Sequence, residues 1–225
     1  MRPSKKKKQA DRPRNSDKSF LIGITGGIGA GKSTVLDAIK ARFPVFLIEA
    51  DETGRKLMEP GKSVFLALVR HYGPQILRED GTIDRVKLTE IGMKDEESQK
   101  ELNEVEHPII KEEILEEIRR IEESCDTMPV ILLEAALLIE GKLDEICDEV
   151  WFVSAPKPVR IRRLMENRGY SRKKAESIIA RQLSYREFLR HADRVIHNGS
   201  DFSKTTAEID RLMKGIYATI CDSEV

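Results

Sequence analysis

The sequence predicts an α/β protein in which helices cover both faces of a parallel sheet, a three-layer sandwich. From Phe20 onward, short apolar runs bounded by Gly, Pro or Asp alternate with segments of helical period. The apolar runs do not alternate with polar residues, as expected for parallel strands that are buried on both faces. A glycine-rich stretch follows the first run directly and leads into a helical segment, which gives the order strand, loop, helix.

Five apolar runs are predicted as strands: residues 20–25, 45–50, 130–134, 149–154 and 193–198. Helices lie between them, and the segment from Pro108 to Glu123 is an example. Pro108 suits the first position of a helix, because the N–H that it lacks would have no partner there. An apolar stripe follows at helical spacing, made by Ile110, Ile114, Ile118 and Ile121.

The composition limits the classes of partner. A chain of 225 residues with 40% hydrophobic content can bury a full core, and its length favours one domain with an inserted lobe over two domains. Lys plus Arg and Asp plus Glu number 39 each, so the net charge offers no general attraction to DNA or to anionic membranes. No apolar stretch reaches the length of a membrane span. We therefore expect no nucleic-acid or membrane partner.

The cysteines and the N-terminus bear on location. Cys125, Cys147 and Cys221 are far apart and form no CxxC pair, which argues against a disulfide framework or a zinc site. The basic N-terminus lacks the apolar core of a signal peptide, so we expect a cytoplasmic protein. Residues 1–19 contain almost no apolar side chains and are predicted to be a disordered basic tail, ahead of a single domain over residues 20–220.

The glycine-rich stretch after the first strand reads GGIGAGKST and satisfies the pattern GxxxxGK[ST], in which Gly26 is the first glycine. Its glycines let successive backbone N–H groups point at phosphate oxygens, and the following helix adds its positive end. Lys32 would reach the β- and γ-phosphates of ATP, and the Ser33 hydroxyl would ligate Mg²⁺. The predicted ATP-binding residues here are Gly27, Ile28, Gly29, Ala30, Gly31, Lys32, Ser33 and Thr34.

A P-loop identifies the nucleotide and leaves the reaction open, because GTPases, motor ATPases and small-molecule kinases share it. Residues 51–54 match the DxxG element of GTPases. They lie only about twenty residues past Lys32, and no NKxD motif follows, so a GTPase switch is not expected.

Two carboxylates, Glu49 and Asp51, end the second predicted strand, at the edge of an open α/β sheet where ligands bind. Two residues apart on a strand, they would point the same way. Asp51 is the better candidate for a carboxylate that takes the proton of a hydroxyl acceptor or holds the metal. Alternatively, Asp51 would be the N-cap of a helix that begins near Glu52.

Between Lys157 and Arg194 the chain carries twelve Lys or Arg residues and four Asp or Glu residues. The pattern is helical and is broken at residues 168–171, where Ser171 makes an N-cap. Such a basic helical hairpin could fold over ATP, exclude water and supply guanidinium groups to the transferring phosphoryl. A solvated basic face would account for many of these charges equally well.

Six blocks, in order, resemble the dephospho-coenzyme A kinase family between Phe20 and Tyr217. They are GITGGIGAGKST, IEADETGRKLMEPG, DGTIDRVKL, LNEVEHPII, ILLEAALLIE and ARQLSYREFLRHADRVIHNGS. The resemblance implies a five-stranded parallel sheet like that of nucleoside monophosphate kinases, with a core over residues 20–52 and 127–220. It also implies a helical substrate-binding lobe over residues 53–126 and a lid near residues 160–190.

The implied reaction is transfer of a phosphoryl group from Mg·ATP to the ribose 3′-hydroxyl of dephospho-coenzyme A, the last step of coenzyme A synthesis. We expect the protein to be a monomer. Asp51 becomes the general base by this resemblance, and Lys32 the catalytic lysine. Arg85 and His107 become substrate-binding candidates. Three further implied roles are ATP binding by Asn198, a second-shell metal group at Glu134, and a γ-phosphate contact by Arg163 or Arg168.

The chain departs from the family pattern at Glu49, where Asp is usual, at Ala136, where Pro is common, and at Asn167, where Arg is frequent. The last departure leaves the choice between Arg163 and Arg168 open. Two alternatives stay open at this point: a nucleoside or deoxynucleoside monophosphate kinase with a phosphate acceptor, and a nucleotide-dependent binding module without turnover.

Overall fold

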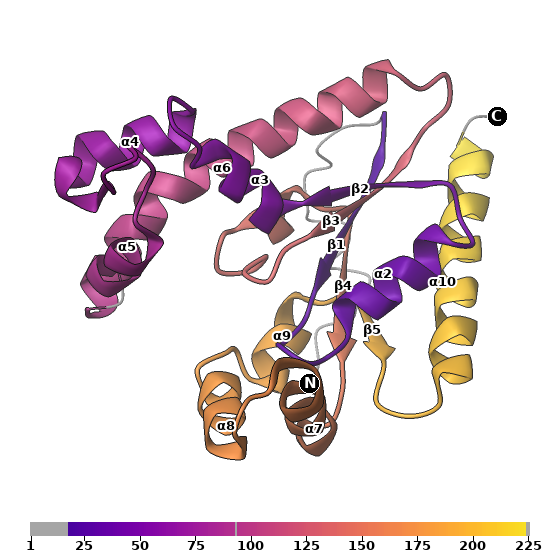
Figure 1. The fold of residues 1–225 in the computed structure, drawn as a ribbon. Coiled ribbons are helices and arrows are strands. Elements are labelled where there is room, and N and C mark those ends of the chain that lie inside the picture. Colours follow the sequence, from indigo (N-terminus) through magenta and orange to yellow (C-terminus); the bar gives the residue numbers. More distant parts are fainter. Residues whose placement is uncertain (1–17, 93, 224–225) are drawn as a thin grey trace. The chain divides into compact units, whose positions relative to one another are not determined.

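The computed structural model describes residues 18–92 and 94–223. The chain divides into two compact units (Figure 1): residues up to 47 together with those from 125 onward form the first unit, and residues 48–124 form the second. The second unit overlaps the segment predicted as a substrate-binding lobe, whose role remains a prediction. The predicted tail falls largely on residues 1–17, outside the described residues, while its last residue, Ser19, is buried.

The sheet has five strands in the order β2-β3-β1-β4-β5. Their bounds are β1 Phe20–Thr25, β2 Val45–Glu49, β3 Val130–Glu134, β4 Glu149–Ser154 and β5 Arg194–His197. The central strand β1 runs parallel to β3 and to β4, with Phe20 opposite Val130 and Ile22 opposite Glu149. The predicted five-stranded parallel sheet is therefore confirmed.

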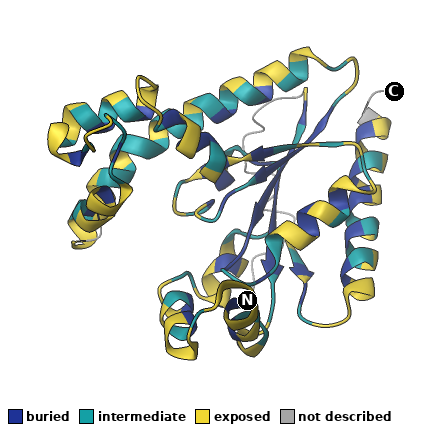
Figure 2. Cartoon of the chain, in the orientation of Figure 1, coloured by how far each residue is buried: buried dark blue, intermediate teal, exposed yellow. Residues whose placement is uncertain are grey.

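The first unit buries both faces of its central strands (Figure 2). The burial of β1 and β4 is almost continuous, as the unbroken apolar runs predicted. Trp151 at the centre of β4 is fully buried and packs in one cluster with residues from the helices α2 Lys32–Lys40 and α10 Phe202–Ser223. Against β4 lies the helix α9 Tyr185–His191, through stacking of Phe152 on Phe188.

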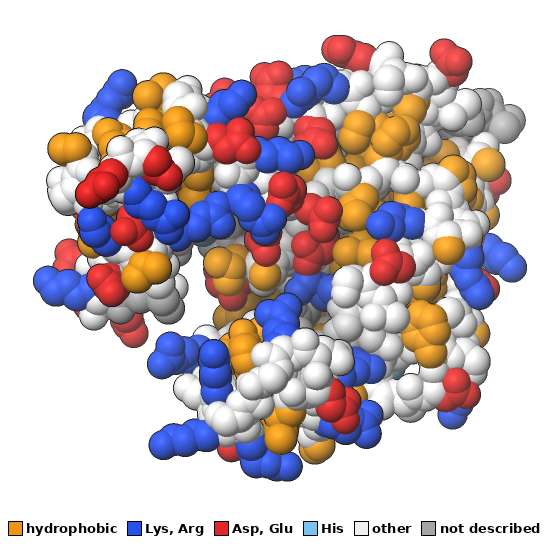
Figure 3. Space-filling model, in the orientation of Figure 1, with side chains coloured by type: hydrophobic (Ala, Val, Ile, Leu, Met, Phe, Trp, Pro, Cys, Tyr) orange, Lys and Arg blue, Asp and Glu red, His pale blue; other side chains and the backbone are white. Residues whose placement is uncertain are grey.

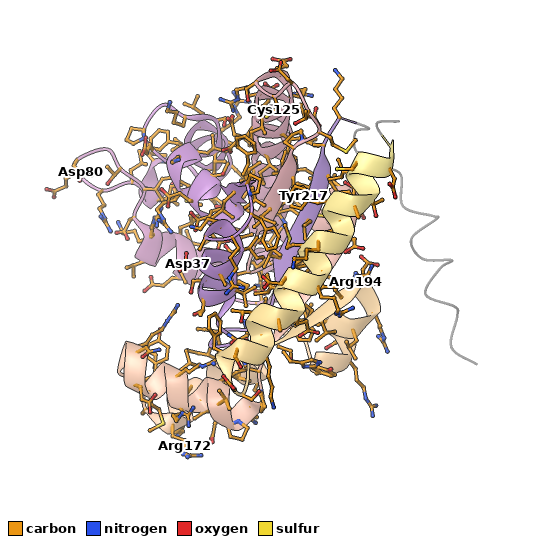
Figure 4. All side chains as sticks on the ribbon, turned by 90° about the vertical axis from the view of Figure 1, so that its right-hand side faces the viewer. Asp37, Asp80, Cys125, Arg172, Arg194 and Tyr217 are labelled. Carbon is orange, nitrogen blue, oxygen red and sulfur yellow. The ribbon has the colours of Figure 1, made fainter. Side chains whose placement is uncertain are left out.

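Three contacts hold α10 against the rest of the first unit. Tyr217, labelled in Figure 4, lies on this helix. The Tyr217 hydroxyl donates to the Pro44 carbonyl over 2.6 Å, and its ring stacks on Phe43. The Arg42 guanidinium binds both carboxylate oxygens of Asp210, at 2.8 and 2.9 Å. This bidentate ion pair helps to fix the orientation of α10.

The second unit is helical and has its own core. It contains α3 Ala50–Leu57, α4 Ser63–Tyr72, α5 Arg85–Gly92 and α6 Glu96–Glu123, with a 3₁₀ turn at Pro74–Ile76. The core is formed by six buried residues, Leu57, Val64, Leu68, Ile76, Ile83 and Leu88. None of the helices in the described part of the chain is long and apolar enough to cross a membrane.

The predicted start of a helix at Pro108 is wrong. α6 begins twelve residues earlier, where the Asp95 side chain accepts a hydrogen bond from the Ser98 N–H, and Pro108 lies inside the helix. Pro108 is exposed, so the carbonyl that loses its partner there can be hydrated. Of the four isoleucines in the predicted apolar stripe, Ile114 and Ile118 are buried, whereas Ile110 and Ile121 are partly exposed.

Candidate active site

The glycine-rich loop links β1 to α2 and is shaped for an anion. Gly29 and Gly31 have φ angles of 76° and 88°, a backbone conformation that residues with a Cβ rarely adopt. Gly31 lies directly before α2, whose first turn carries no acidic residue. The first N–H groups and the positive end of α2 therefore face the loop, an arrangement that suits a phosphate group.

Lys32, the first residue of α2, is held beside this loop. Its ammonium donates to the Gly26 carbonyl over 3.2 Å and lies 3.4 Å from a Glu134 carboxylate oxygen at the end of β3. The two side chains are 16% and 14% exposed. Glu134 therefore neutralises and positions the lysine, a more direct contact than the sequence indicated.

Two predicted residues support the loop through its carbonyls. The Asn198 side chain, 3% exposed, donates to the carbonyls of Ala30 at 3.0 Å and Gly31 at 3.3 Å. Arg163 donates to the same Ala30 carbonyl over 3.0 Å and to the Asn198 carbonyl over 2.9 Å. These contacts make Asn198 and Arg163 a brace for the loop, because the donors engage carbonyls of the protein.

The predicted basic hairpin consists of α7 Lys157–Arg168 and α8 Arg172–Ala180. Gly169 ends α7 in a left-handed conformation, and the Ser171 hydroxyl caps α8 as predicted by accepting from the Lys174 N–H. Lys and Arg side chains gather over the hairpin (Figure 3), and Arg172 marks its outer end in Figure 4. Arg168 is exposed at the last turn of α7.

Sequence reasoning missed two residues that join the hairpin to the loop, Arg160 and Gln182. Arg160 Nε donates to the Ile28 carbonyl over 2.8 Å, and its Nη2 donates to Gln182 Oε1 over 2.6 Å. The same oxygen accepts from the Ile28 N–H over 2.9 Å. Both side chains line a cavity of about 720 Å³ that Gly27 and Ala30 also line. The only sequence signal for Arg160 is the excess of Lys and Arg residues between Lys157 and Arg194.

The second unit holds the predicted carboxylates in a different arrangement from the one expected. α3 begins at Ala50, with Glu49 in extended conformation at the N-cap position. β2 ends at Glu49, and Asp51 is on the first turn of α3, so the prediction that the two carboxylates share a strand and point the same way is wrong. The alternative that Asp51 is the N-cap of a helix is also wrong, because Glu49 holds that position. The Thr53 hydroxyl donates to the Glu49 carbonyl over 3.2 Å, and Asp51 is exposed.

The two other acceptor-side candidates also lie in the second unit. Arg85 opens α5, whose first N–H groups are capped by the Asp84 carboxylate. His107 lies within α6, and burial lowers its pKa, so its imidazole is neutral at pH 7. It can offer a hydrogen bond there, without a charge.

Glu106, next to His107, is a further polar residue that the sequence did not single out. Burial raises the pKa of its carboxyl to about 7, and the nearby charge of Arg85 opposes this rise. One of its oxygens, like the buried Tyr72 hydroxyl, has no hydrogen-bond partner within residues 18–92 and 94–223. Near pH 7, the Glu106 carboxyl is therefore about half protonated, close to the predicted substrate-binding residue Arg85.

The donor set fits magnesium. Ser33 is exposed at the second position of α2, and Glu134 lies beside Lys32, so a hydroxyl and a carboxylate oxygen are present near the loop. Mg²⁺ prefers such oxygen ligands, needs few of them from the protein and keeps several waters. No group of three or more His, Cys, Asp or Glu residues suited to a metal occurs in the described part of the chain.

A parallel sheet of order 2-3-1-4-5, a phosphate loop after its central strand and a basic helical hairpin define a kinase of the P-loop class. The family model for dephospho-CoA kinase matches residues 20–204, and the chain belongs to this family. It is therefore an ATP-dependent phosphotransferase with an alcohol group as acceptor.

Individual proteins agree with this family. The chain is 37% identical over 193 residues to a dephospho-CoA kinase of Moorella thermoacetica, covering 84% of this chain and 89% of that protein. The crystal structure of TT1252 from Thermus thermophilus is 27% identical and superposes with a TM-score of 0.73, covering 90% and 98% of the two chains. A dephospho-CoA kinase structure from Campylobacter jejuni, 23% identical with a TM-score of 0.63 and coverages of 91% and 98%, shows the same fold.

Proposed function

We propose that the chain transfers the γ-phosphoryl group of Mg·ATP to the ribose 3′-hydroxyl of dephospho-coenzyme A. Membership of the family supports the choice of substrate. The observation that carries the chemistry is the placement of Lys32, whose ammonium lies at the mouth of a glycine-rich loop and is held there by Glu134 at 3.4 Å. A P-loop with this lysine binds and stabilises a phosphate chain.

On the donor side, the start of α2 and the loop amides other than those of Ile28 and Ala30, which donate to Gln182 and to the Gly27 carbonyl, bind the phosphates of ATP. Lys32 offsets the charge that develops on the transferring group. Ser33 would hold Mg²⁺ directly, and Glu134 would orient its hydration shell. When bound, this ion adds positive charge at the β- and γ-phosphates. Asn198 and Arg163 keep the loop in its binding shape through the Ala30 carbonyl.

On the acceptor side, we assign the proton of the ribose hydroxyl to Asp51. Its carboxylate is exposed on the first turn of α3 and is not used as a helix cap, which leaves it available to a ligand. Arg85 would bind an anionic group of the acceptor, and the neutral His107 would donate or accept a hydrogen bond. A general base suits a hydroxyl acceptor, whereas a phosphate acceptor needs little help from one.

The test is an acceptor panel. Purified full-length chain is incubated with Mg·ATP and dephospho-coenzyme A, adenosine, pantothenate or nucleoside monophosphates in turn, and ADP release is measured. Release with dephospho-coenzyme A alone supports the proposal. Preferred turnover of a nucleoside monophosphate would replace it with a monophosphate kinase, and no turnover with any acceptor would indicate a binding module.

A further inference from the structure

Arg160 has neutral partners at both of its anchored nitrogens. Nε donates to the Ile28 carbonyl over 2.8 Å, and Nη2 donates to the amide oxygen of Gln182 over 2.6 Å. Two other arginines of the first unit pair with carboxylates instead: Arg42 with Asp210 at 2.8 Å and Arg194 with Glu149 at 2.8 Å. Arg163 also has neutral partners, but both of its terminal nitrogens donate to backbone carbonyls. No carboxylate within residues 18–92 and 94–223 pairs with Arg160.

This guanidinium is also partly withdrawn from water. Burial lowers the pKa of Arg160, and no neighbouring charge contributes to the shift in either direction. A desolvated cation without an anion costs free energy, which binding of an anion would recover. The folded chain therefore holds a cation ready for an anionic ligand.

The guanidinium lies over the phosphate loop. A methyl group added at Gly27 would collide with Arg160 Nη2 and would approach Arg160 Nη1 within 2.9 Å, so the glycine leaves room for the arginine. Arg160 Nη1 donates to no acceptor in the described part of the chain. Arg160, Gly27 and Ala30 line the same cavity of about 720 Å³. Nη1 can therefore donate to a ligand that enters above the loop.

Gln182 fixes this orientation. Its Oε1 accepts from Arg160 and from the Ile28 N–H, while the Ile28 carbonyl accepts from Arg160. Both backbone polar groups of Ile28 are thus bound, the carbonyl by Arg160 of α7 and the N–H by Gln182, which lies just after α8. The shape of the loop and the direction of the guanidinium are set by one closed set of three hydrogen bonds.

We propose that Arg160 is the lid cation that binds the phosphate chain of the nucleoside triphosphate, and that Gln182 is the positioning residue that aims it. The two arginines that the sequence left open differ from Arg160 in their contacts, since Arg163 donates to loop carbonyls and Arg168 is exposed at the end of α7. The inference rests on the proposed function only in requiring that ATP bind at the loop.

The first test replaces Arg160→Met and compares it with Arg162→Met, an exposed arginine of the same helix. Turnover with dephospho-coenzyme A should fall on the order of a hundredfold for Arg160→Met and stay within about twofold for the control. Affinity for the non-hydrolysable β,γ-imido analogue of ATP, measured by calorimetry, should fall more than about tenfold.

The second test separates phosphate binding from a structural role. Gln182→Glu keeps the acceptor oxygen and places a negative charge beside Arg160, so the melting temperature should hold or rise. The neutralised guanidinium should nevertheless bind the imido analogue about tenfold more weakly. Ser177→Asp, exposed on α8, adds the same charge elsewhere on the hairpin and should change the affinity less than about threefold.

The proposal is overturned if Gln182→Glu binds the analogue as well as Ser177→Asp does, since Arg160 would then be a structural pin. Retention of affinity and turnover by a folded Arg160→Met would overturn it as well. Should Arg160→Met fail to fold, Gln182→Glu decides alone. An inactive wild-type chain would count against the proposed acceptor, and the binding measurements would still decide the role of Arg160.

Discussion

Glu106 makes the stability of the chain depend on pH in a direction opposite to that of most carboxylates. Its pKa is about 7 in the folded chain, against 4.5 for the ordinary group. Because the folded chain holds this proton more tightly than the unfolded chain, its contribution to stability is complete below about pH 4.5. The contribution is lost as the pH rises from about 4.5 to about 7 and is constant above that.

Glu106→Gln keeps the shape of the neutral acid and removes the titration. At about 1.4 kcal/mol per pH unit, the pKa difference predicts that the variant is more stable than wild type by about 1 kcal/mol at pH 5 and by about 3 kcal/mol at pH 8. Urea unfolding of both proteins at these two pH values measures the gap.

Glu104→Gln is the matched control, because Glu104 lies on the same helix and is exposed, in an ion pair with Lys100. This pair contributes at most about 1 kcal/mol, so the control should show little change of the gap with pH. A gap for Glu106→Gln that stays constant between pH 5 and pH 8 would refute the reasoning, since the carboxyl would then titrate equally in both states.

Three substitutions test the site. Lys32→Ala should lower turnover on the order of a hundredfold or more in a folded protein. It should also lower the free energy of unfolding by about 1–3 kcal/mol, because Glu134 loses its ion-pair partner. Near-normal activity would count against the role of Lys32 as the P-loop lysine. Asp51→Asn should reduce turnover by roughly a hundred- to ten-thousandfold with a nearly unchanged ATP dissociation constant, and more than about a tenth of wild-type turnover would remove the general-base role. Asn198→Asp keeps the size but loses the donors to the Ala30 and Gly31 carbonyls, so ATP affinity in a titration should fall about tenfold, with unchanged affinity contradicting the bracing role.

The strands and the phosphate loop could be predicted from the sequence, because each depends on local pattern. Unbroken apolar runs specify buried parallel strands, and β1, β3 and β4 begin and end at the predicted residues. The loop needs glycines at positive φ, and Gly29 and Gly31 supply them. A motif that requires positive φ angles can be recognised in the sequence, because it requires glycine at fixed positions.

The helix starts were less predictable. α3 begins directly after the strand at Ala50, without a side-chain cap at Glu49, so no capping residue marked the change. Pro108 has the pattern of a helix start, yet α6 carries it at an exposed position, where the packing of Ile114 and Ile118 outweighs one missing hydrogen bond. Tertiary burial decided these elements, and it cannot be read from neighbouring residues.

The contacts of Arg160 and the raised pKa of Glu106 could not be predicted for a similar reason. Arg160 meets Ile28 across 132 residues of sequence, and its sequence context resembles that of the exposed Arg162. Glu106 is one of many acidic residues on α6, and only its burial near Arg85 distinguishes it. Both depend on distant segments meeting in the folded chain.

The position of the phosphate in the product tests the proposed acceptor. Purified chain is incubated with dephospho-coenzyme A and Mg·ATP, and the product is examined by ³¹P and ¹H NMR. We expect one new phosphomonoester, coupled to the ribose 3′ proton, formed in equal amount to ADP and absent with Lys32→Ala. A phosphate at the 2′-hydroxyl or on a phosphate group, or ADP released without a new ester, would contradict it.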